Sequence, residues 1–366
     1  MCEKQKMKNT IIKNYIIVGQ GLAGTILAQT LLKLGKSIII IDEPTLSKAS
    51  KIAAGLYNPV VFKRLVKSWM ADELVPYMDY FYRDAEQLLG IQFYFKKQIV
   101  RLFAEEQEKT LWLKKTDEPV GKYLSKTIEN NFLSDVIYNP LGSANVIDAG
   151  NLDTRLFLEK FRAYFKTNNA LLEEIFDYTQ LKKFENYVSY KNYTADKIIF
   201  CEGYETTKNP YFNWLPFKLT KGETITIKIL GEHQIDFEKV INKSVFILPI
   251  GSGIYKVGAT YEWNELNENI TEKGRSEMAD KLQKVLKIPF EIIDHQAGIR
   301  PTVNDRRPLI GLHPQYPTLG VFNGLGTKGV MLAPYFAKQF VNFLENNLPL
   351  EKDVDIKRFK INTISF

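Results

Sequence analysis

The chain opens with two short, mainly apolar runs separated by a glycine turn and an amphipathic segment. Tyr15–Val18 and Ser37–Ile41 are predicted to be buried strands, and Thr25–Leu34 is predicted to be a helix that follows the tight turn Gly19–Gly24. Two continuous apolar strands that flank a helix predict a parallel sheet covered on both faces. The apolar side of the predicted helix consists of Ile26, Leu27, Leu31 and Leu34.

The middle of the chain has a different pattern. Glu223–Ile229 alternates apolar and polar residues, and Ser244–Ile250 and Ile254–Thr260 are joined through a Gly-Ser-Gly hairpin signal. Ala71–Leu89 is predicted to be a helix, and Phe93–Phe103 is aromatic and strand-like. Alternation and hairpins favour an antiparallel sheet with one covered face.

The C-terminal part returns to the α/β style. Leu152–Phe165 is predicted to be helical, and Lys197–Phe200 is a buried strand that runs into Cys201-Glu-Gly203. A strand near Gly320 leads into the glycine-rich loop Gly324–Gly329, which opens a helix from Val330 to about residue 344. We therefore predict an α/β (α+β) fold in which a discontinuous nucleotide-binding domain carries an inserted antiparallel domain. The predicted nucleotide-binding domain covers 1–65, 145–215 and 297–366, and the predicted substrate-binding domain covers 66–144 and 216–296.

Composition and charge narrow the class of protein. The 366 residues are 45% hydrophobic and 25% charged, which is ordinary for a globular protein. Two cysteines support neither a disulfide framework nor a cysteine-based zinc site. The net charge of +7 is concentrated partly before Tyr15, and the remaining basic doublets are scattered, which favours a lysine-rich solvated surface over a nucleic-acid footprint. No apolar stretch is long enough for a membrane span and no signal peptide is evident, so we expect a cytoplasmic protein.

The first glycine turn has the spacing of a dinucleotide-binding motif. Gly19 allows the tight turn, Gly21 lets backbone approach a pyrophosphate, and Gly24 permits close packing of helix on strand. Asp42 ends the second strand, where a carboxylate meets ribose hydroxyls and repels a 2′-phosphate, and Glu43 is the neighbouring alternative. The competing interpretation is that the glycines only shape a strand–helix turn.

The late glycine loop bears on the identity of the nucleotide, because the first motif alone does not choose between NAD and FAD. The amides of this loop open a second helix, and Lys328 adds a full charge. Such a site stabilises the negative charge of a reduced flavin. An ordinary glycine loop before a packing helix is the alternative. The loop residues predicted to contact the cofactor are Gly324, Leu325, Gly326, Thr327, Lys328, Gly329 and Val330.

Taken together, these motifs resemble those of the D-amino-acid-oxidase/glycine-oxidase-type superfamily of FAD-dependent oxidoreductases. The pieces occur in the family's order across nearly the whole chain: Gly19–Gly24 with Asp42-Glu43, Ala49–Gly55, Ile198–Gly203, Leu248-Pro249 with Val257–Thr260, Ala297–Pro301, Pro308–Gly311 and the closing glycine loop.

The resemblance implies FAD as cofactor and assigns roles to individual residues. Arg300 matches the arginine that pairs with a substrate carboxylate, for which a planar guanidinium is well suited, although a structural ion pair is the alternative. Ser50 and Lys51 would approach the pyrophosphate, and the backbone of Leu181 would meet the adenine. The remaining predicted cofactor contacts are Leu22, Ala23, Ala53, Ala54, Gly55 and Gly203, of which Ala53, Ala54 and Gly55 would pass close to the isoalloxazine ring.

The cysteines, histidines and tyrosines bear on how the cofactor and the substrate are bound. No cysteine lies near Arg300 or the closing loop and no histidine lies between Asp42 and Gly55, so we expect noncovalent FAD. Tyr255 and Tyr261 flank Val257–Thr260 and are candidate substrate contacts, with ordinary packing as the better interpretation of either. The three histidines share no metal-ligand spacing, and no metal is predicted.

The predicted activity is oxidation of the C–N bond of an amino acid or secondary amine by hydride transfer to flavin N5. Two alternatives stay open. The closing Gly-Thr-Lys-Gly resembles Gly-Ser-Arg-Gly of MnmC-type tRNA-modifying enzymes, which oxidise a carboxymethylaminomethyl uridine, although the modest charge does not favour tRNA. The second alternative is that the protein is a non-catalytic sensor that binds a nucleotide on the same fold.

Overall fold

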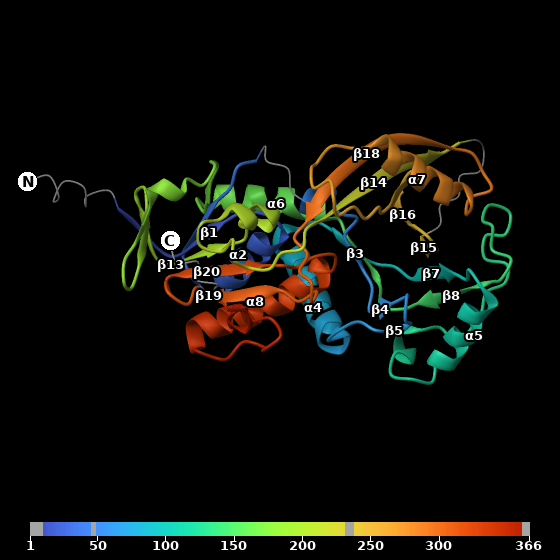
Figure 1. Cartoon of the computed structure of the whole chain (residues 1–366), viewed down its shortest axis with the longest axis horizontal. Helices are drawn as coiled ribbons and strands as arrows, with labels where there is room; N and C mark the ends of the chain where they lie inside the picture. The colour runs from blue at the N-terminus through green and yellow to red at the C-terminus, as the bar shows by residue number, and fades with distance from the viewer. Residues whose placement is uncertain (1–9, 45–48, 231–237, 361–366) are drawn as a thin grey trace, which may run out of the picture. The chain divides into compact units, whose positions relative to one another are not determined.

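The computed structural model describes residues 10–44, 49–230 and 238–360 (Figure 1). Its contacts divide the chain into two compact units, each assembled from separated stretches. The chain passes between the units after residues 51, 154, 219 and 299. The sequence predicted these four crossings after residues 65, 144, 215 and 296. The first unit comprises 1–51, 155–219 and 300–366, and the second comprises 52–154 and 220–299.

An eight-stranded mixed sheet forms the centre of the first unit. Its middle is parallel, as predicted: β1 pairs with β2 on one side and with β13 on the other, and β13 also pairs with β20. The edge strand β10 pairs parallel with β2, and β11, β12 and β19 are antiparallel to their neighbours. The strands are β1 (Ile11–Val18), β2 (Ile38–Ile41), β10 (Leu171–Leu172), β11 (Leu181–Lys183), β12 (Val188–Tyr190), β13 (Tyr193–Phe200), β19 (Leu309–Leu312) and β20 (Leu319–Asn323).

Helices α2 (Leu22–Lys33) and α8 (Gly329–Asn346) pack against each other, and α2 also contacts β1, β2 and β20. Ile26, Leu27 and Leu31 are buried, as the apolar pattern predicts. The prediction for Leu34 is wrong: the helix ends at Lys33, so Leu34 is its C-cap and is 56% exposed. Helix α6 (Thr154–Thr167) and the short helices η3 (Tyr178–Gln180), η4 (Gly203–Lys208) and η5 (Ile356–Arg358) complete the first unit.

A seven-stranded, mostly antiparallel sheet forms the second unit. The predicted hairpin is confirmed, since β16 and β17 pair antiparallel. Helix α7 (Glu272–Gln283) contributes Met278 and Leu282 to the apolar cluster that covers one face of the sheet. In sheet order the strands are β18 (Phe290–Arg300), β14 (Thr220–Ile229), β17 (Ile254–Gly258), β16 (Phe246–Gly251), β15 (Val240–Asn242), β7 (Ile99–Leu102) and β8 (Ser143–Val146).

The rest of the second unit consists of two small sheets and further helices. Helix α4 (Ala71–Leu89) has the predicted bounds and ends at Gly90, whose φ of +64° suits a glycine. The predicted strand Phe93–Phe103 is two strands that belong to different sheets. The elements are α3 (Ala49–Ile52), which crosses between the units, α5 (Glu106–Lys115), η2 (Gly121–Tyr123), β3 (Leu56–Tyr57), β9 (Gly150–Leu152), β6 (Tyr94–Lys96), β4 (Val60–Val61) and β5 (Val66–Lys67).

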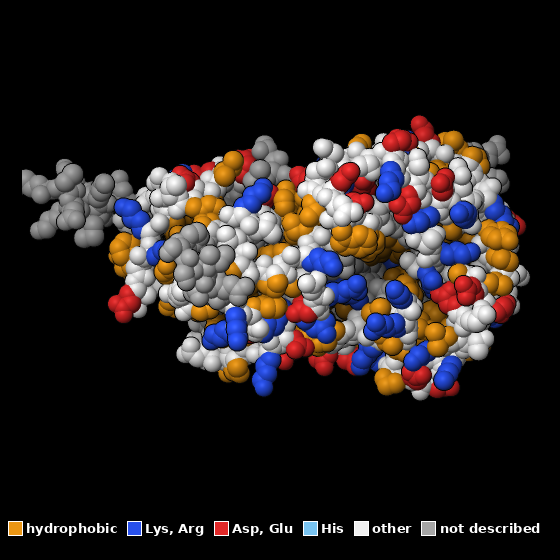
Figure 2. All heavy atoms as spheres, viewed as in Figure 1, with side chains coloured by type: hydrophobic (Ala, Val, Ile, Leu, Met, Phe, Trp, Pro, Cys, Tyr) orange, Lys and Arg blue, Asp and Glu red, His pale blue; other side chains and the backbone are white. Residues whose placement is uncertain are grey.

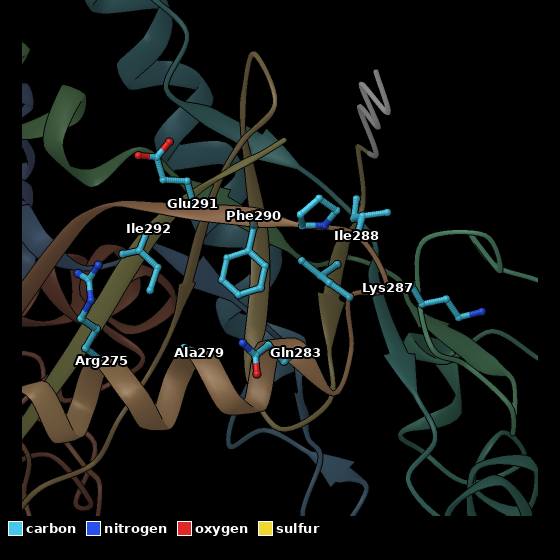
Figure 3. A pocket seen from close by; sticks show the side chains of 10 residues that line it. Arg275, Ala279, Gln283, Lys287, Ile288, Phe290, Glu291 and Ile292 are labelled. Atoms are coloured by element: carbon cyan, nitrogen blue, oxygen red, sulfur yellow. The ribbon is translucent and has the colours of Figure 1, made fainter. Parts of the chain in front are cut away.

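A groove of about 840 Å³ lies between α7 and β18 (Figure 3). Phe290 and Ile292 of β18 and Arg275 of α7 line it, and no residue of the groove belongs to the predicted site. Among the helices that the structure describes, none combines the length and the apolar character needed to cross a bilayer.

Candidate flavin site

The first glycine turn is shaped by close backbone packing. A Cβ on Gly24 would lie 1.9 Å from the carbonyl oxygen of Gly19, and one on Gly19 would lie 2.6 Å from the carbonyl oxygen of Cys201. Gly21 differs, because the nearest atom to its Cβ position is the hydroxyl of Ser50 at 3.7 Å. Two glycines therefore permit the fold of the turn, whereas the third leaves space in front of it.

The N-terminus of α2 lies at this space. Gly21 is the N-cap and has no side chain to bond the first amides. The amide of Leu22 donates to the Ser50 hydroxyl at 3.2 Å, which places Ser50 beside the positive end of the helix dipole. The ammonium of Lys51 donates to the carbonyl of Pro44 at 3.1 Å. Ser50 and the helix terminus together form an arrangement that suits a pyrophosphate.

The acidic end of β2 closes one side of the turn. Asp42 is buried, and its Oδ1 accepts a hydrogen bond of 2.7 Å from the amide of Gln20. Its Oδ2 lies 2.7 Å from a guanidinium nitrogen of Arg162 in α6. Glu43, the neighbouring alternative, is half-buried. Sequence reasoning missed Arg162, because no motif surrounds it.

The end of β13 is tied to the closing glycine loop through one side chain. Gly203 has a φ of +60°, and the side-chain amide of Asn323 donates to its carbonyl oxygen at 2.8 Å. The carbonyl oxygen of the same Asn323 side chain accepts the amide of Gly324 at 2.8 Å. Sequence reasoning missed Asn323, although its place directly before a glycine loop was a usable signal.

Glu202 is an ionisable group inside the first unit, one residue before Gly203. Its carboxylate accepts hydrogen bonds from the Tyr178 hydroxyl and, at 2.8 Å, from the side-chain amide of Asn209. Burial raises the pKa of Glu202 to about 7, against the lowering effect of these two donors. Tyr178 lies three residues before Leu181, the buried residue that is predicted to meet the adenine.

The closing loop turns through Gly324 (φ +71°) and Gly326 (φ +55°) into α8. Lys328 is the N-cap of α8 and makes no side-chain capping bond. Burial, and then the charge of Arg306, lower the pKa of Lys328 to about 8. Its ammonium is therefore mostly charged at neutral pH. The N-terminus of α8 and Lys328 together make this loop electropositive.

Two close contacts join the closing loop to other predicted motifs of the first unit. A Cβ on Gly326 would lie 3.1 Å from the methyl carbon of Thr302, whose amide donates to the carbonyl of Arg300 at 2.9 Å. A Cβ on Gly329 would lie 3.1 Å from a methyl carbon of Leu22, the first residue of α2. The half-buried Arg300 thus belongs to a segment that packs on the loop, and the loop packs on the first glycine motif.

The predicted isoalloxazine neighbours belong to the second unit. Ala53 is exposed, Ala54 is half-buried, and Gly55 (φ +65°) would place a Cβ 1.8 Å from the carbonyl oxygen of Leu152. The ammonium of Lys256 donates to the carbonyl of Ile52, directly before these residues. Sequence reasoning did not identify Lys256.

The two candidate tyrosines lie in different surroundings within the second unit. Tyr255 is 1% exposed and packs in the apolar cluster under α7. Tyr261 is 55% exposed and stacks on Trp263 with ring centroids 6.3 Å apart. Their roles as substrate contacts stay predictions. In the described part of the chain, no group of three or more histidine, cysteine or acidic residues has the arrangement of a metal site.

The first glycine turn, Asp42, Gly203 and the closing loop thus lie together within one unit, in an arrangement that suits a nucleotide. A family model described as DAO, FAD dependent oxidoreductase, matches residues 14–342. The chain therefore belongs to the DAO family of FAD-dependent oxidoreductases. It is an enzyme, and FAD is its cofactor.

Individual relatives agree with this assignment. The chain is 21% identical over 364 residues to the uncharacterized oxidoreductase YurR of Bacillus subtilis (strain 168), covering 91% of this chain and 95% of YurR. Glycine oxidase from Bacillus cereus ATCC 14579 has a similar structure, with a TM-score of 0.74, 20% identity and coverage of 92% of this chain and 96% of that one. Iminodiacetate oxidase (IdaA) from Chelativorans sp. BNC1 also has a similar structure, with a TM-score of 0.75 and 19% identity. The match covers 93% of this chain and 98% of that one. These likenesses show the fold.

The residues present fit FAD. The open space at Gly21, the Ser50 hydroxyl at the start of α2 and the buried carboxylate of Asp42 suit a pyrophosphate and an adjoining ribose. The electropositive closing loop suits a group that gains negative charge on reduction. Which atoms of FAD each residue contacts stays a prediction.

Proposed function

We propose that the enzyme oxidises the C–N bond of an amino acid or a secondary amine that carries a carboxylate. The observation that carries the proposal is the packing of the Arg300–Thr302 segment on the electropositive closing loop. Two proteins of similar fold are named glycine oxidase and iminodiacetate oxidase, and both named compounds combine an amine nitrogen with a carboxylate.

Arg300 is proposed to bind the substrate carboxylate through two parallel hydrogen bonds. This contact fixes the orientation of the α-carbon and leaves the neutral amine to donate its electrons as the C–H bond breaks. When bound, FAD supplies the hydride acceptor at N5. The products of this step are an imine and a proton, and water then hydrolyses the imine to a carbonyl compound and an amine. Lys328 and the N-terminus of α8 would stabilise the negative charge that the cofactor gains on reduction.

The substrate class can be tested by anaerobic loss of visible flavin absorbance with glycine, N-methylglycine, iminodiacetate and simple amines without a carboxylate. We expect the carboxylate-bearing amines to reduce the enzyme. Arg300→Lys is expected to raise their apparent KM about 10- to 100-fold, because lysine loses the bidentate geometry. The control Arg155→Lys changes an exposed arginine of α6 that pairs with Glu159. Reduction by hydroxy acids and not by amines would contradict the proposal.

The tRNA alternative is tested by adding bulk tRNA in the same anaerobic assay. Figure 2 shows Lys and Arg side chains among acidic ones on the face in view. Several basic residues of the second unit are paired: Lys67 and Lys122 with Asp72, and Arg101 with Glu108. This pairing offsets the charge available to phosphates, so we favour a small substrate. Flavin reduction only by tRNA, with affinity that falls steeply with salt, would favour the alternative. Because the family consists of oxidoreductases, the sensor alternative is set aside.

A further inference from the structure

Arg162, in the second half of α6, lies at the centre of a polar network behind the first glycine turn. Its side chain is 17% exposed, and its guanidinium contacts Asp42, Gln20 and Glu173. Two of these contacts join distant parts of the chain: Asp42 is 120 residues away and Gln20 is 142 residues away, whereas Glu173 is 11 residues away. The sequence motifs gave no role to this arginine.

The guanidinium binds Asp42 at two places. Nη1 donates to Oδ2 of the carboxylate at 2.7 Å, and Nη2 donates to the main-chain carbonyl of Asp42 at 3.2 Å. The other carboxylate oxygen accepts the amide of Gln20 at 2.7 Å. Both carboxylate oxygens and the main-chain carbonyl of Asp42 therefore accept hydrogen bonds, which fixes the plane of the carboxylate.

Arg162 is itself held in place. Its Nε and Nη2 lie 3.1 Å and 3.0 Å from one oxygen of Glu173, whose other oxygen pairs with Lys166 at 2.9 Å. The side chain of Gln20 accepts from Arg162 at 3.0 Å and donates to the carbonyl of Leu158 at 3.0 Å. The planar guanidinium therefore joins α6, the end of β2 and the glycine turn into one rigid arrangement.

We propose that Arg162 is a positioning residue for the adenosine half of FAD, acting through Asp42. A carboxylate oxygen has more than one lone pair, so an oxygen that accepts from a protein donor can also accept from a ribose hydroxyl. Arg162 fixes the orientation of the buried Asp42 carboxylate, and through Gln20 it couples this orientation to the turn that is predicted to face the pyrophosphate. The inference rests on the predicted contact between Asp42 and ribose, and it is independent of the proposed amine substrate.

The test measures binding of FAD, ADP and FMN to the full chain freed of cofactor, by calorimetry or flavin fluorescence. Arg162→Gln is expected to weaken FAD and ADP by a similar factor of about tenfold or more, because both contain the adenosine ribose. Binding of FMN, which lacks adenosine, is expected not to change. The exposed Arg155→Gln of the same helix is the control and should bind all three ligands as the unaltered protein does.

A double-mutant cycle distinguishes positioning from an independent contact. If Arg162 acts through Asp42, the double variant Asp42→Asn/Arg162→Gln loses no more ADP affinity than Asp42→Asn alone. Additive losses would overturn the proposal, and so would unchanged ADP binding in Arg162→Gln. Unchanged ADP binding in Asp42→Asn would show that the ribose contact itself is wrong. Should Arg162→Gln fold poorly, Arg162→Lys keeps the charge, loses the forked geometry and gives the same comparison.

Discussion

The imidazole Nε2 of His295 lies 2.8 Å from Oε2 of Glu223, and both side chains are 4% exposed. Glu223 also accepts hydrogen bonds from the amide and the hydroxyl of Thr271, the N-cap of α7. The ammonium of Lys221, which is 1% exposed, lies 3.6 Å from the same carboxylate. One carboxylate thus joins β14, β18 and the start of α7 inside the second unit.

We predict that Glu223→Ala destabilises the protein by about 3–5 kcal/mol, because it removes the buried carboxylate beside the Lys221 ammonium and two hydrogen bonds from the cap of α7. Urea unfolding monitored by circular dichroism measures the change. The control Glu265→Ala alters an exposed glutamate between β17 and α7. A loss below about 1 kcal/mol would show that the buried cluster contributes little.

Glu202 predicts a pH dependence of stability. Its pKa is about 7 in the folded protein against 4.5 as the ordinary value, so the folded state binds this proton more tightly than the unfolded chain. Its contribution to stability is therefore complete below about pH 4.5 and is lost as the pH rises through about 7, by roughly 3 kcal/mol at most.

Glu202→Gln removes this titration. The difference in unfolding free energy between the cofactor-free parent and variant should move in favour of the variant from pH 4.5 to pH 7 and then level off. Denaturant unfolding at several pH values measures it. A difference that is constant over this range would contradict the assigned pKa.

Two glycines of the first turn provide a matched pair of variants. Gly21→Ala places its methyl group 3.7 Å from the nearest protein atom, and the backbone φ of −82° is allowed for alanine, so the cofactor-free protein should keep its stability. FAD affinity should nevertheless fall about tenfold or more, because the methyl group occupies the predicted pyrophosphate space.

Gly24→Ala should behave in the opposite way. Its methyl group would lie 1.9 Å from the carbonyl oxygen of Gly19, so the strand–helix turn itself must shift and the protein should be destabilised. Thermal unfolding without FAD separates the two effects. Equal FAD affinity in Gly21→Ala and the parent would place the pyrophosphate elsewhere.

Lys328 predicts an effect on the reduction potential of the flavin. Because its pKa is about 8, the ammonium is charged at pH 7 and favours the more negative, reduced cofactor. Lys328→Met should lower the midpoint potential at pH 7 by roughly 30 mV for each tenfold loss of this preference. Spectroelectrochemical titration measures it, with the exposed Lys352→Met as control. An unchanged potential would mean that Lys328 does not sense the flavin charge.

The cofactor is predicted to be held without a covalent bond. Precipitation with acid should therefore release all of the yellow colour into the supernatant, where its absorbance is measured. Flavin that stays with the precipitated protein after washing would contradict the prediction and would indicate an attachment that no cysteine near Arg300 or histidine near Asp42 explains.

Much of the fold and part of the site followed from the sequence, because local patterns report local burial and local turn geometry. The apolar runs at the end of β1 and in β2 marked a parallel core, and the Gly-Ser-Gly signal marked the β16–β17 hairpin. The first glycine turn and Asp42 were predicted from their spacing together with the strand and helix that flank the turn, since a phosphate-binding turn needs its residue types at set positions.

Other relationships depended on the path of the chain in three dimensions. Arg162 reaches Asp42 from 120 residues away, and Asn323 reaches Gly203 from the same distance. Neither pair produces a periodic pattern in the sequence, because the partners come together only when the chain folds. Periodicity likewise extended the first helix to Leu34, whereas the actual helix end left that side chain exposed. The sequence by itself determined the types of element and the nucleotide motif. The tertiary structure alone decided which distant side chains hold that motif in place.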